Sequence, residues 1–194
     1  MHISNNLGGN VNFIPNVPYD QYGNPMVDSI GYLAITVDID HYLIHVGATW
    51  IHSHAVSVAS GANKDFLIKN SSTGEIHLKD FVFTSSQGDA NIILYKAPTI
   101  TANGTLQTWI NKNLGLQANT PYSSIYQDPT ITATGTLLEH FKIIGSKQTG
   151  GAHLGGDDEW VIPVGTNILL RYRNNSPSAD AISFAIKVLD IPAP

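Results

Sequence analysis

The chain has 194 residues, of which 42% are hydrophobic and 13% charged, so it is long enough for one sizeable domain and too apolar for intrinsic disorder. A formal net charge of -5 without a Lys/Arg cluster disfavours a nucleic-acid binder, and the absence of Cys excludes disulfides, thiolate zinc sites and Cys nucleophiles. The start lacks a signal-peptide pattern, and no apolar run approaches the roughly 18 residues that span a bilayer. We therefore expect a soluble protein made without secretion, with neither nucleic acid nor membrane as a partner.

Residues 1–30 are rich in Asn, Gly and Pro and show no sustained hydrophobic period. Proline removes a backbone donor and fixes φ, so this stretch is not expected to form long regular structure. It is either a disordered leader or an extended N-terminal arm that docks onto a partner. The side chains such an arm would bury are Phe13, Ile14, Val17, Tyr19 and Tyr22.

From residue 31 to the C-terminus, apolar residues alternate in many short runs separated by Gly, Asn and Pro. The predicted strands are 31–37, 40–46, 49–58, 64–69, 75–83, 90–96, 105–110, 122–126, 136–144, 167–173 and 181–189. The alternation slips by one near Lys79 and Asp80, which indicates a β-bulge. The sequence predicts an all-β protein in which residues 31–194 form a single jelly-roll-like antiparallel β-sandwich behind the arm.

One phrase occurs twice, as YKAPTITANGTL from Tyr95 and as YQDPTITATGTL from Tyr126. In each copy a strand ends at the Tyr, a Pro interrupts the ladder, and a Gly-containing turn leads into a returning strand. The phrase contains no acid, base or nucleophile at catalytic spacing, and two copies are too few for a solenoid. We interpret it as scaffold at two similarly placed edges of one sandwich.

Histidines offer the best sequence-based candidates for a site. His52 and His54 alternate along one strand, and His41 and His45 share a face of the preceding predicted strand. Imidazoles on neighbouring strands can hold a divalent metal, whereas hydrogen-bonded histidines at a packed surface are the alternative. We favour the packed arrangement and expect no metal site, no cofactor and no catalytic residues.

A comparison with cupins gives the same expectation. The Gly…His-x-His part of their first motif is similar to Gly47, His52 and His54, but no Glu follows. In the second motif, Pro163-Val164-Gly165 resembles the turn, whereas Ile168 occupies the place of the His. The resemblance thus supports a jelly-roll turn and leaves a cupin-like metalloprotein as the least favoured hypothesis. The glycine-rich stretch 145–160 lacks the P-loop pattern and is predicted to be an exposed flexible loop.

Residues 38–189 resemble a family of tailed-bacteriophage virion proteins described as head decoration, spike or fibre proteins. The resemblance is carried in order by IDHYLIHVGATW, the two repeated phrases and EWVIPVGTNILLRYRNNS. WINKNLGLQ departs from the family, because its basic residues are reduced to Lys112.

The resemblance implies a non-enzymatic structural protein of the virion that decorates or stabilises the capsid surface. Its expected partners are the major capsid protein lattice and further copies of itself, as a homotrimer, after synthesis in the host cytoplasm. The alternative is a tail or fibre host-recognition module that binds glycans through Trp50, Trp109 or Trp160, although each of these tryptophans also suits a core position.

Overall fold

The computed structural model describes residues 3–4, 10–11, 39–70, 74–144, 150–154 and 159–191. The chain divides into two compact units, residues 1–42 and 43–194. In the first unit, the backbones of β1 (Ile3–Ser4) and β2 (Asn10–Val11) pair antiparallel. The five predicted arm anchors and the predicted strand 31–37 lie outside the described residues.

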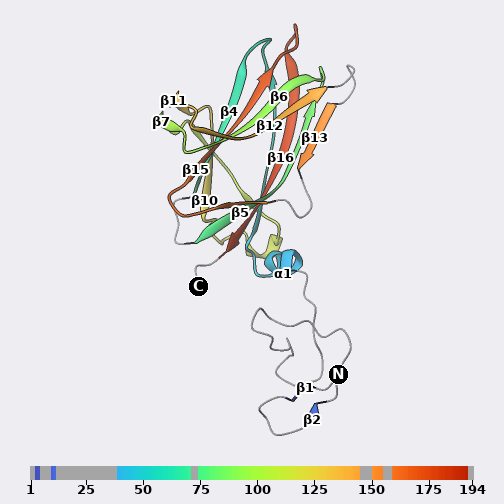
Figure 1. Cartoon of the computed structure of the whole chain (residues 1–194), viewed down its shortest axis with the longest axis vertical. Coiled ribbons are helices and arrows are strands. Elements are labelled where there is room, and N and C mark those ends of the chain that lie inside the picture. The colour runs from blue at the N-terminus through green and yellow to red at the C-terminus, as the bar shows by residue number, and fades with distance from the viewer. Residues whose placement is uncertain are drawn as a thin grey trace. The chain divides into compact units, whose positions relative to one another are not determined.

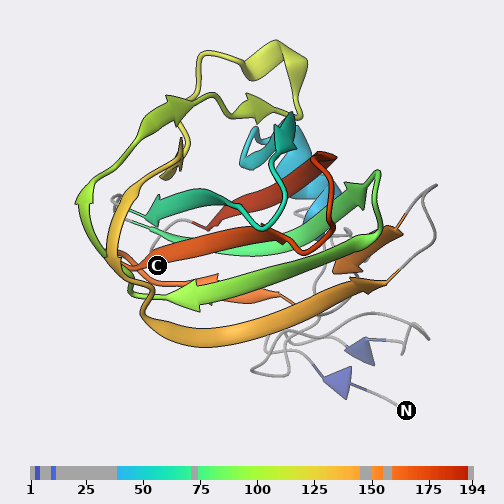
Figure 2. The same ribbon diagram turned by 90° about the horizontal axis from the view of Figure 1, so that it is seen from above.

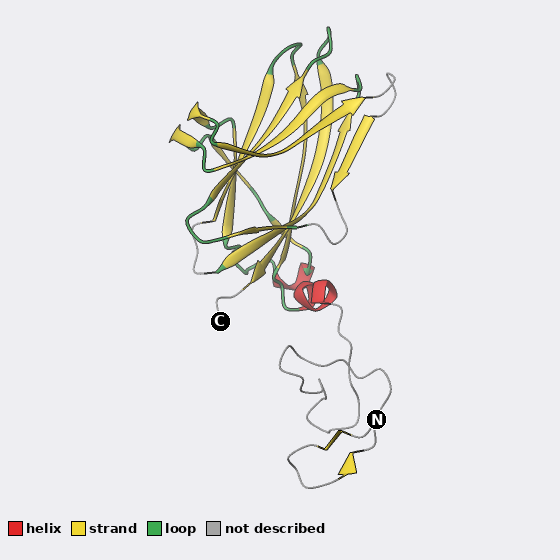
Figure 3. Cartoon of the chain, in the orientation of Figure 1, coloured by secondary structure: helices red, strands yellow, loops and turns green. Residues whose placement is uncertain are grey.

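The described residues of the second unit lie mainly in strands, as Figure 3 shows. The strands are β3 (Thr49–Val58), β4 (Asn63–Asn70), β5 (Glu75–Ser85), β6 (Asp89–Lys96), β7 (Thr99–Ala102), β8 (Thr105–Gln107), β9 (Ile110–Asn111), β10 (Ser123–Gln127), β11 (Thr130–Ala133), β12 (Thr136–Ile144), β13 (Gly150–Leu154), β14 (Trp160–Ile162), β15 (Asn167–Asn174) and β16 (Asp180–Ile191). A short 3-10 helix, η1 (Leu114–Leu116), follows β9. None of the helices among the described residues has the length and apolar character of a membrane-crossing segment.

The strands form two main antiparallel sheets, whose layers Figures 1 and 2 show from two directions. One sheet has the order β12-β6-β15-β4-β10-β8, and the other has β13-β5-β16-β3-β9, with β14 also pairing with β5. The jelly-roll order appears when β7 to β11 are left out and β13 and β14 are counted as one strand. The remaining strands, numbered 1 to 8 in chain order, are then β3, β4, β5, β6, β12, β13 with β14, β15 and β16. In these numbers the two sheets have the orders 1-8-3-6 and 2-7-4-5. This double Greek-key order is that of a jelly roll, so the predicted fold class is confirmed.

The core lies between the two sheets, where inward side chains alternate with outward ones along each strand. Phe66, Phe81, Phe83 and Phe184 are at most 3% exposed, and the rings of Phe66 and Phe184 meet edge-to-face with centroids 4.4 Å apart. Burying such a ring stabilises the fold by roughly 1.5–3 kcal/mol. The sandwich therefore has an aromatic centre that needs no disulfide.

The irregularity predicted near Lys79 is confirmed. Lys187 of β16 pairs with Asp80 of β5, whereas the next residue, Val188, pairs with Leu78. Lys79 is thus the extra residue of a β-bulge. Without a bulge, Leu78 and Phe81 would lie on opposite faces, because they are three positions apart and side chains alternate along a strand. The bulge places both on the inner face, where they belong to the core.

The prediction of a strand at 40–46 is wrong, because residues Ile39–His45 form the helix α1. Gly47 ends this helix with φ of +74°, and a Schellman pair of hydrogen bonds runs from Ala48 N–H to Leu43 C=O (2.8 Å) and from Gly47 N–H to Ile44 C=O (3.0 Å). A run of seven residues is too short for alternation to separate strand from helix.

The glycine-rich stretch is also partly different from its prediction. Gly150–Leu154 form β13, whose backbone pairs with residues 81–85 of β5. Pairing with an existing strand supplies backbone hydrogen bonds that local sequence does not reveal. By contrast, the turn at Pro163 is found where we expected it, closed by a hydrogen bond from Thr166 N–H to Pro163 C=O (3.1 Å).

The two repeated phrases interlock around a local twofold axis. The strand before the first copy, β6, pairs with the strand after the second copy, β12, and β10 pairs with β8 in the same way. The two Thr-Ile-Thr-Ala segments, β7 and β11, pair with each other through Ile100 and Ile131, as a ribbon that Figure 1 shows projecting from the sandwich. The returning strands of the two copies, β8 and β12, are the two edge strands of the six-stranded sheet, as expected, and the copies also contact each other through β7 and β11.

The same axis organises the six-stranded sheet. One cross-strand row runs through all six strands in the palindromic order Leu137, Tyr95, Leu169, Leu67, Tyr126 and Leu106. The two central leucines alternate with core residues and so point away from the sandwich interior, yet both are 0% exposed. The Tyr and Leu that the two copies share therefore flank a second, smaller apolar cluster on the outer face of this sheet.

Glycine explains how the copies fit together. Gly104 and Gly135 have φ of +88° and +87°. A Cβ on Gly104 would meet the carbonyl oxygen of Gln127 at 2.2 Å, and a Cβ on Gly135 would meet that of Lys96 at 2.2 Å. Each copy thus uses its glycine to approach the backbone of the other copy.

Candidate functional site

The predicted histidine pair lies inside the sandwich. His52 and His54 project from the inner face of β3, and their rings stack with centroids 5.9 Å apart. His52 is 4% exposed, its edge meets Trp109, and both imidazoles contact Phe184. The pair therefore belongs to the aromatic core, in agreement with the prediction that these histidines lie at a packed surface.

Burial favours the neutral form of His52, and a hydrogen bond fixes its tautomer. Its Nδ1 lies 3.0 Å from the carbonyl oxygen of Thr108, so the Nδ1–H donates to that oxygen. Burial lowers the pKa of His52 below 6.5; the carbonyl of Thr108 raises it, and the neighbouring His54 lowers it further. The other nitrogen, Nε2, is buried and has no hydrogen-bond partner among the described residues.

The helix separates the other two histidines from this pair. His41 and His45 are exposed residues of α1 rather than members of a neighbouring strand. In the described part of the chain, no group of three or more His, Asp or Glu side chains is placed to hold a metal ion. The geometry gives a metal-binding hypothesis no support, and Ile168, at the cupin His position, is a core residue.

Two buried carboxylates serve the scaffold in different ways. Asp180 is 0% exposed and accepts hydrogen bonds from Tyr172, Ser85, Ser86 Oγ (2.9 Å) and Gln87 N–H (3.0 Å). Burial acts to raise the pKa of Asp180, but these hydrogen bonds outweigh it and hold the pKa below its ordinary value. This ionised carboxylate ties β15 and β16 to the turn between β5 and β6.

Asp190 shows the opposite behaviour. Its Oδ2 accepts hydrogen bonds from Trp50 Nε1 (2.6 Å) and from Tyr122 N–H (3.1 Å), whereas Oδ1 has no partner among the described residues. Burial raises the pKa of Asp190 to about 6, against the two hydrogen bonds, which lower it. Asp190 is therefore a buried carboxyl group that titrates near pH 6 and is held by Trp50 and the Tyr122 amide.

The outer face of the second sheet carries a shallow depression of about 430 Å³ over β5, β16 and β3. Its floor consists of small side chains on the central strand, Ser183 and Ala185, flanked by Thr84 and Ser53. The hydroxyls of Thr84 and Ser183 hydrogen-bond to each other at 2.6 Å. This depression is broad and open and is lined by no Lys, Arg, Asp or Glu, which suits contact with a broad partner better than capture of a small molecule.

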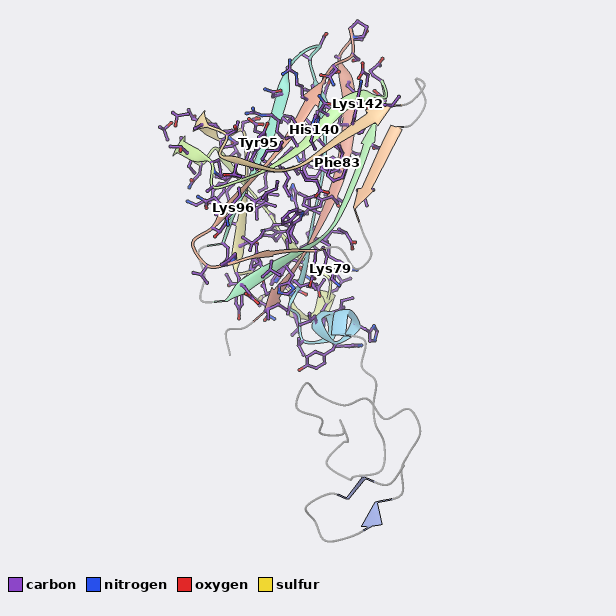
Figure 4. All side chains as sticks on the ribbon, in the orientation of Figure 1. Lys79, Phe83, Tyr95, Lys96, His140 and Lys142 are labelled. Carbon is purple, nitrogen blue, oxygen red and sulfur yellow. The ribbon has the colours of Figure 1, made fainter. Side chains whose placement is uncertain are left out.

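A more enclosed cavity of about 170 Å³ lies where β14 approaches the ends of β6, β12 and β15. Its walls are Leu138, Trp160, Val161, Ile162, Pro163, Thr166 and Ile168, and Lys96 also lines it. Figure 4 labels Lys96 and Tyr95, the two residues that end β6. The residues come from three separate stretches of chain, so no local sequence signal marks this cavity.

The three tryptophans predicted as candidates for glycan binding differ in accessibility. Trp50 and Trp109 are 2% and 8% exposed, so they fill core positions. Trp160 is partly exposed and donates a hydrogen bond from Nε1 to Glu139 Oε2 at 3.2 Å. It is the one of these three rings that a partner can reach.

Comparisons of this chain with protein-family models and with curated proteins found no match. The candidate surfaces therefore stand on fold and side-chain geometry.

Proposed function

We propose that this protein is a non-enzymatic structural component of a virion that decorates or stabilises the capsid surface. The observation that carries the proposal is the distribution of side chains between core and surface. His52, Asp180 and Asp190 are all at most 5% exposed and serve the scaffold, whereas large aliphatic side chains are exposed. Leu106, Leu114, Leu137 and Ile144 are 63%, 78%, 55% and 80% exposed.

Exposed aliphatic groups favour adhesion, because covering them removes apolar surface from water. The jelly-roll order supports the same proposal, since this architecture recurs in capsid and lectin domains, although fold alone does not establish function. The sequence resemblance described above adds its expectation of lattice binding. A closed homotrimer, with the major capsid protein lattice as partner, is the assembly we propose.

Quantitative mass spectrometry and antibody labelling in electron micrographs of purified virions test this role. We expect label over the heads and a copy number that matches the repeat of the capsid lattice. Label at the tail in a few copies per particle, together with binding to host glycans, would instead support the host-recognition alternative. Absence from purified particles would refute both virion roles.

A further inference from the structure

The cavity at β14 has the form of a receptor for one aromatic ring. Its walls are largely apolar, with the hydroxyl of Thr166 as one polar group and Lys96 as the charged group that lines it. The hydrogen bond from Trp160 Nε1 to Glu139 (3.2 Å) holds the indole ring in place. The hydrogen bond restrains this one ring of the wall, which lowers the entropy cost of binding.

Size limits what the cavity accepts. A volume of about 170 Å³ is close to the ~150 Å³ of an apolar protein cavity that takes up benzene. One six-membered ring therefore fits, whereas an indole or a sugar ring with its hydroxyl groups fits less well. Thr166 lines the cavity and offers a hydrogen-bond partner to a phenolic hydroxyl, which favours Tyr over Phe.

The charge of Lys96 indicates which group should stand next to the bound aromatic ring. Lys96 is exposed and forms no ion pair with any other residue in the described ranges. Its backbone is pinned by the close approach of Gly135 from the second copy of the repeat. The cavity therefore presents a fixed apolar pocket beside an available ammonium group, the complement of an aromatic residue next to a carboxylate.

The chain itself contains such a segment. Residues 1–38 include none of the ten Lys and Arg residues but contain Asp20, Asp28 and Asp38. Tyr19-Asp20 is the one place in this range where an acid directly follows an aromatic residue. Pro18 restricts the backbone just before it, so less entropy is lost when the segment is bound.

We propose that the cavity receives Tyr19 from the N-terminal segment of a second copy of this chain, with Asp20 pairing with Lys96. Copies joined in this way form a heterologous contact, which closes into a ring when the rotation between copies allows it. The proposal rests on the assembly role proposed above and names the contact that joins the copies.

The test uses the full-length chain, with its mass measured by light scattering across a concentration series. We expect the unmodified chain to associate, and Lys96→Glu and Asp20→Lys each to weaken association about tenfold or more. The double variant, in which the charges are exchanged, restores association to within a few fold of the unmodified chain. Lys142→Glu is the matched control, because Lys142 is also exposed and the charge change is equal, but it does not line the cavity.

Fluorescence provides a second readout. Trp160 is the partly exposed ring of the three, so association should shift its emission, and Trp160→Phe should remove that shift. Thermal unfolding of each variant checks that it is folded. If a glutamate variant is not folded, Lys96→Gln and Lys142→Gln are compared instead.

A chain that stays monomeric at every concentration would overturn the proposal. So would equal effects of Lys96→Glu and Lys142→Glu, or undiminished association of Asp20→Lys. Because the isolated chain is used, these outcomes do not depend on where the protein lies in a virion. Conversely, absence of the protein from virion heads would refute the decoration role and leave the contact between copies intact.

Discussion

Replacing Asp190 with Asn should raise the free energy of unfolding at neutral pH. The carboxyl is 5% exposed, and its Oδ1 has no hydrogen-bond partner among the described residues. Burial raises its pKa from 3.8 to about 6. At 1.36 kcal/mol per pKa unit, this difference corresponds to about 3 kcal/mol.

The sign follows from proton linkage. A carboxyl group whose folded-state pKa is raised contributes its stability fully below the unfolded pKa of 3.8 and loses it as the pH rises through about 6. The substituted amide cannot ionise, and its oxygen can still accept hydrogen bonds from Trp50 and from the Tyr122 amide. The two proteins should therefore be about equally stable near pH 4, with Asp190→Asn more stable by about 3 kcal/mol above pH 7.

Urea unfolding followed by circular dichroism between pH 4 and pH 8 measures the difference directly. Subtracting the two curves cancels the other ionisable groups, because they are common to both proteins. A difference that stays constant across this range would refute the reasoning, since it would mean that Asp190 has an ordinary pKa. Lower stability of Asp190→Asn at pH 8 would show that the ionised carboxylate is satisfied in the folded protein.

Two further substitutions test the scaffold. Gly135→Ala places a Cβ 2.2 Å from the carbonyl oxygen of Lys96, so urea unfolding should show a free energy of unfolding lower by about 2–4 kcal/mol. Gly61→Ala is the control, because Gly61 also has a positive φ but a Cβ there would lie in open space. Equal losses in the two variants would contradict the steric argument. Asp180→Ala removes the acceptor of the buried Tyr172 and Ser85 hydroxyls and should cost about 3–5 kcal/mol at pH 7. This loss should shrink as the pH falls through the lowered pKa of Asp180. A loss below about 1 kcal/mol in the same assay would show that these hydrogen bonds contribute little.

Much of the fold could be predicted because each strand carries its own periodic signal. The strands at 49–58 and 136–144 have the predicted bounds, and the slip in alternation at Lys79 is the observed bulge. The helix at Ile39–His45 could not be predicted in this way, because seven residues contain too little periodicity and Gly47 also fits the cupin-like motif.

The candidate sites were less predictable. Alternation correctly places His52 and His54 on one face of a strand, but it does not reveal the burial that makes them part of the core. Trp160 was a sequence candidate for glycan binding, but the cavity that it forms with Lys96 and Thr166 had no local signal, because a cavity between sheet edges depends on which distant strands become neighbours.

By itself, the sequence determined most of the strands, the turns and the choice of an all-β sandwich, since alternation and turn chemistry act over a few residues. Only the tertiary structure decided that the two repeated phrases pair with each other and that β14 closes a cavity beside Lys96. It also decided that Asp190 is buried with hydrogen bonds to one of its two carboxylate oxygens. These outcomes depend on contacts between residues far apart along the chain. Their energies come from the assembled packing, which no short segment contains.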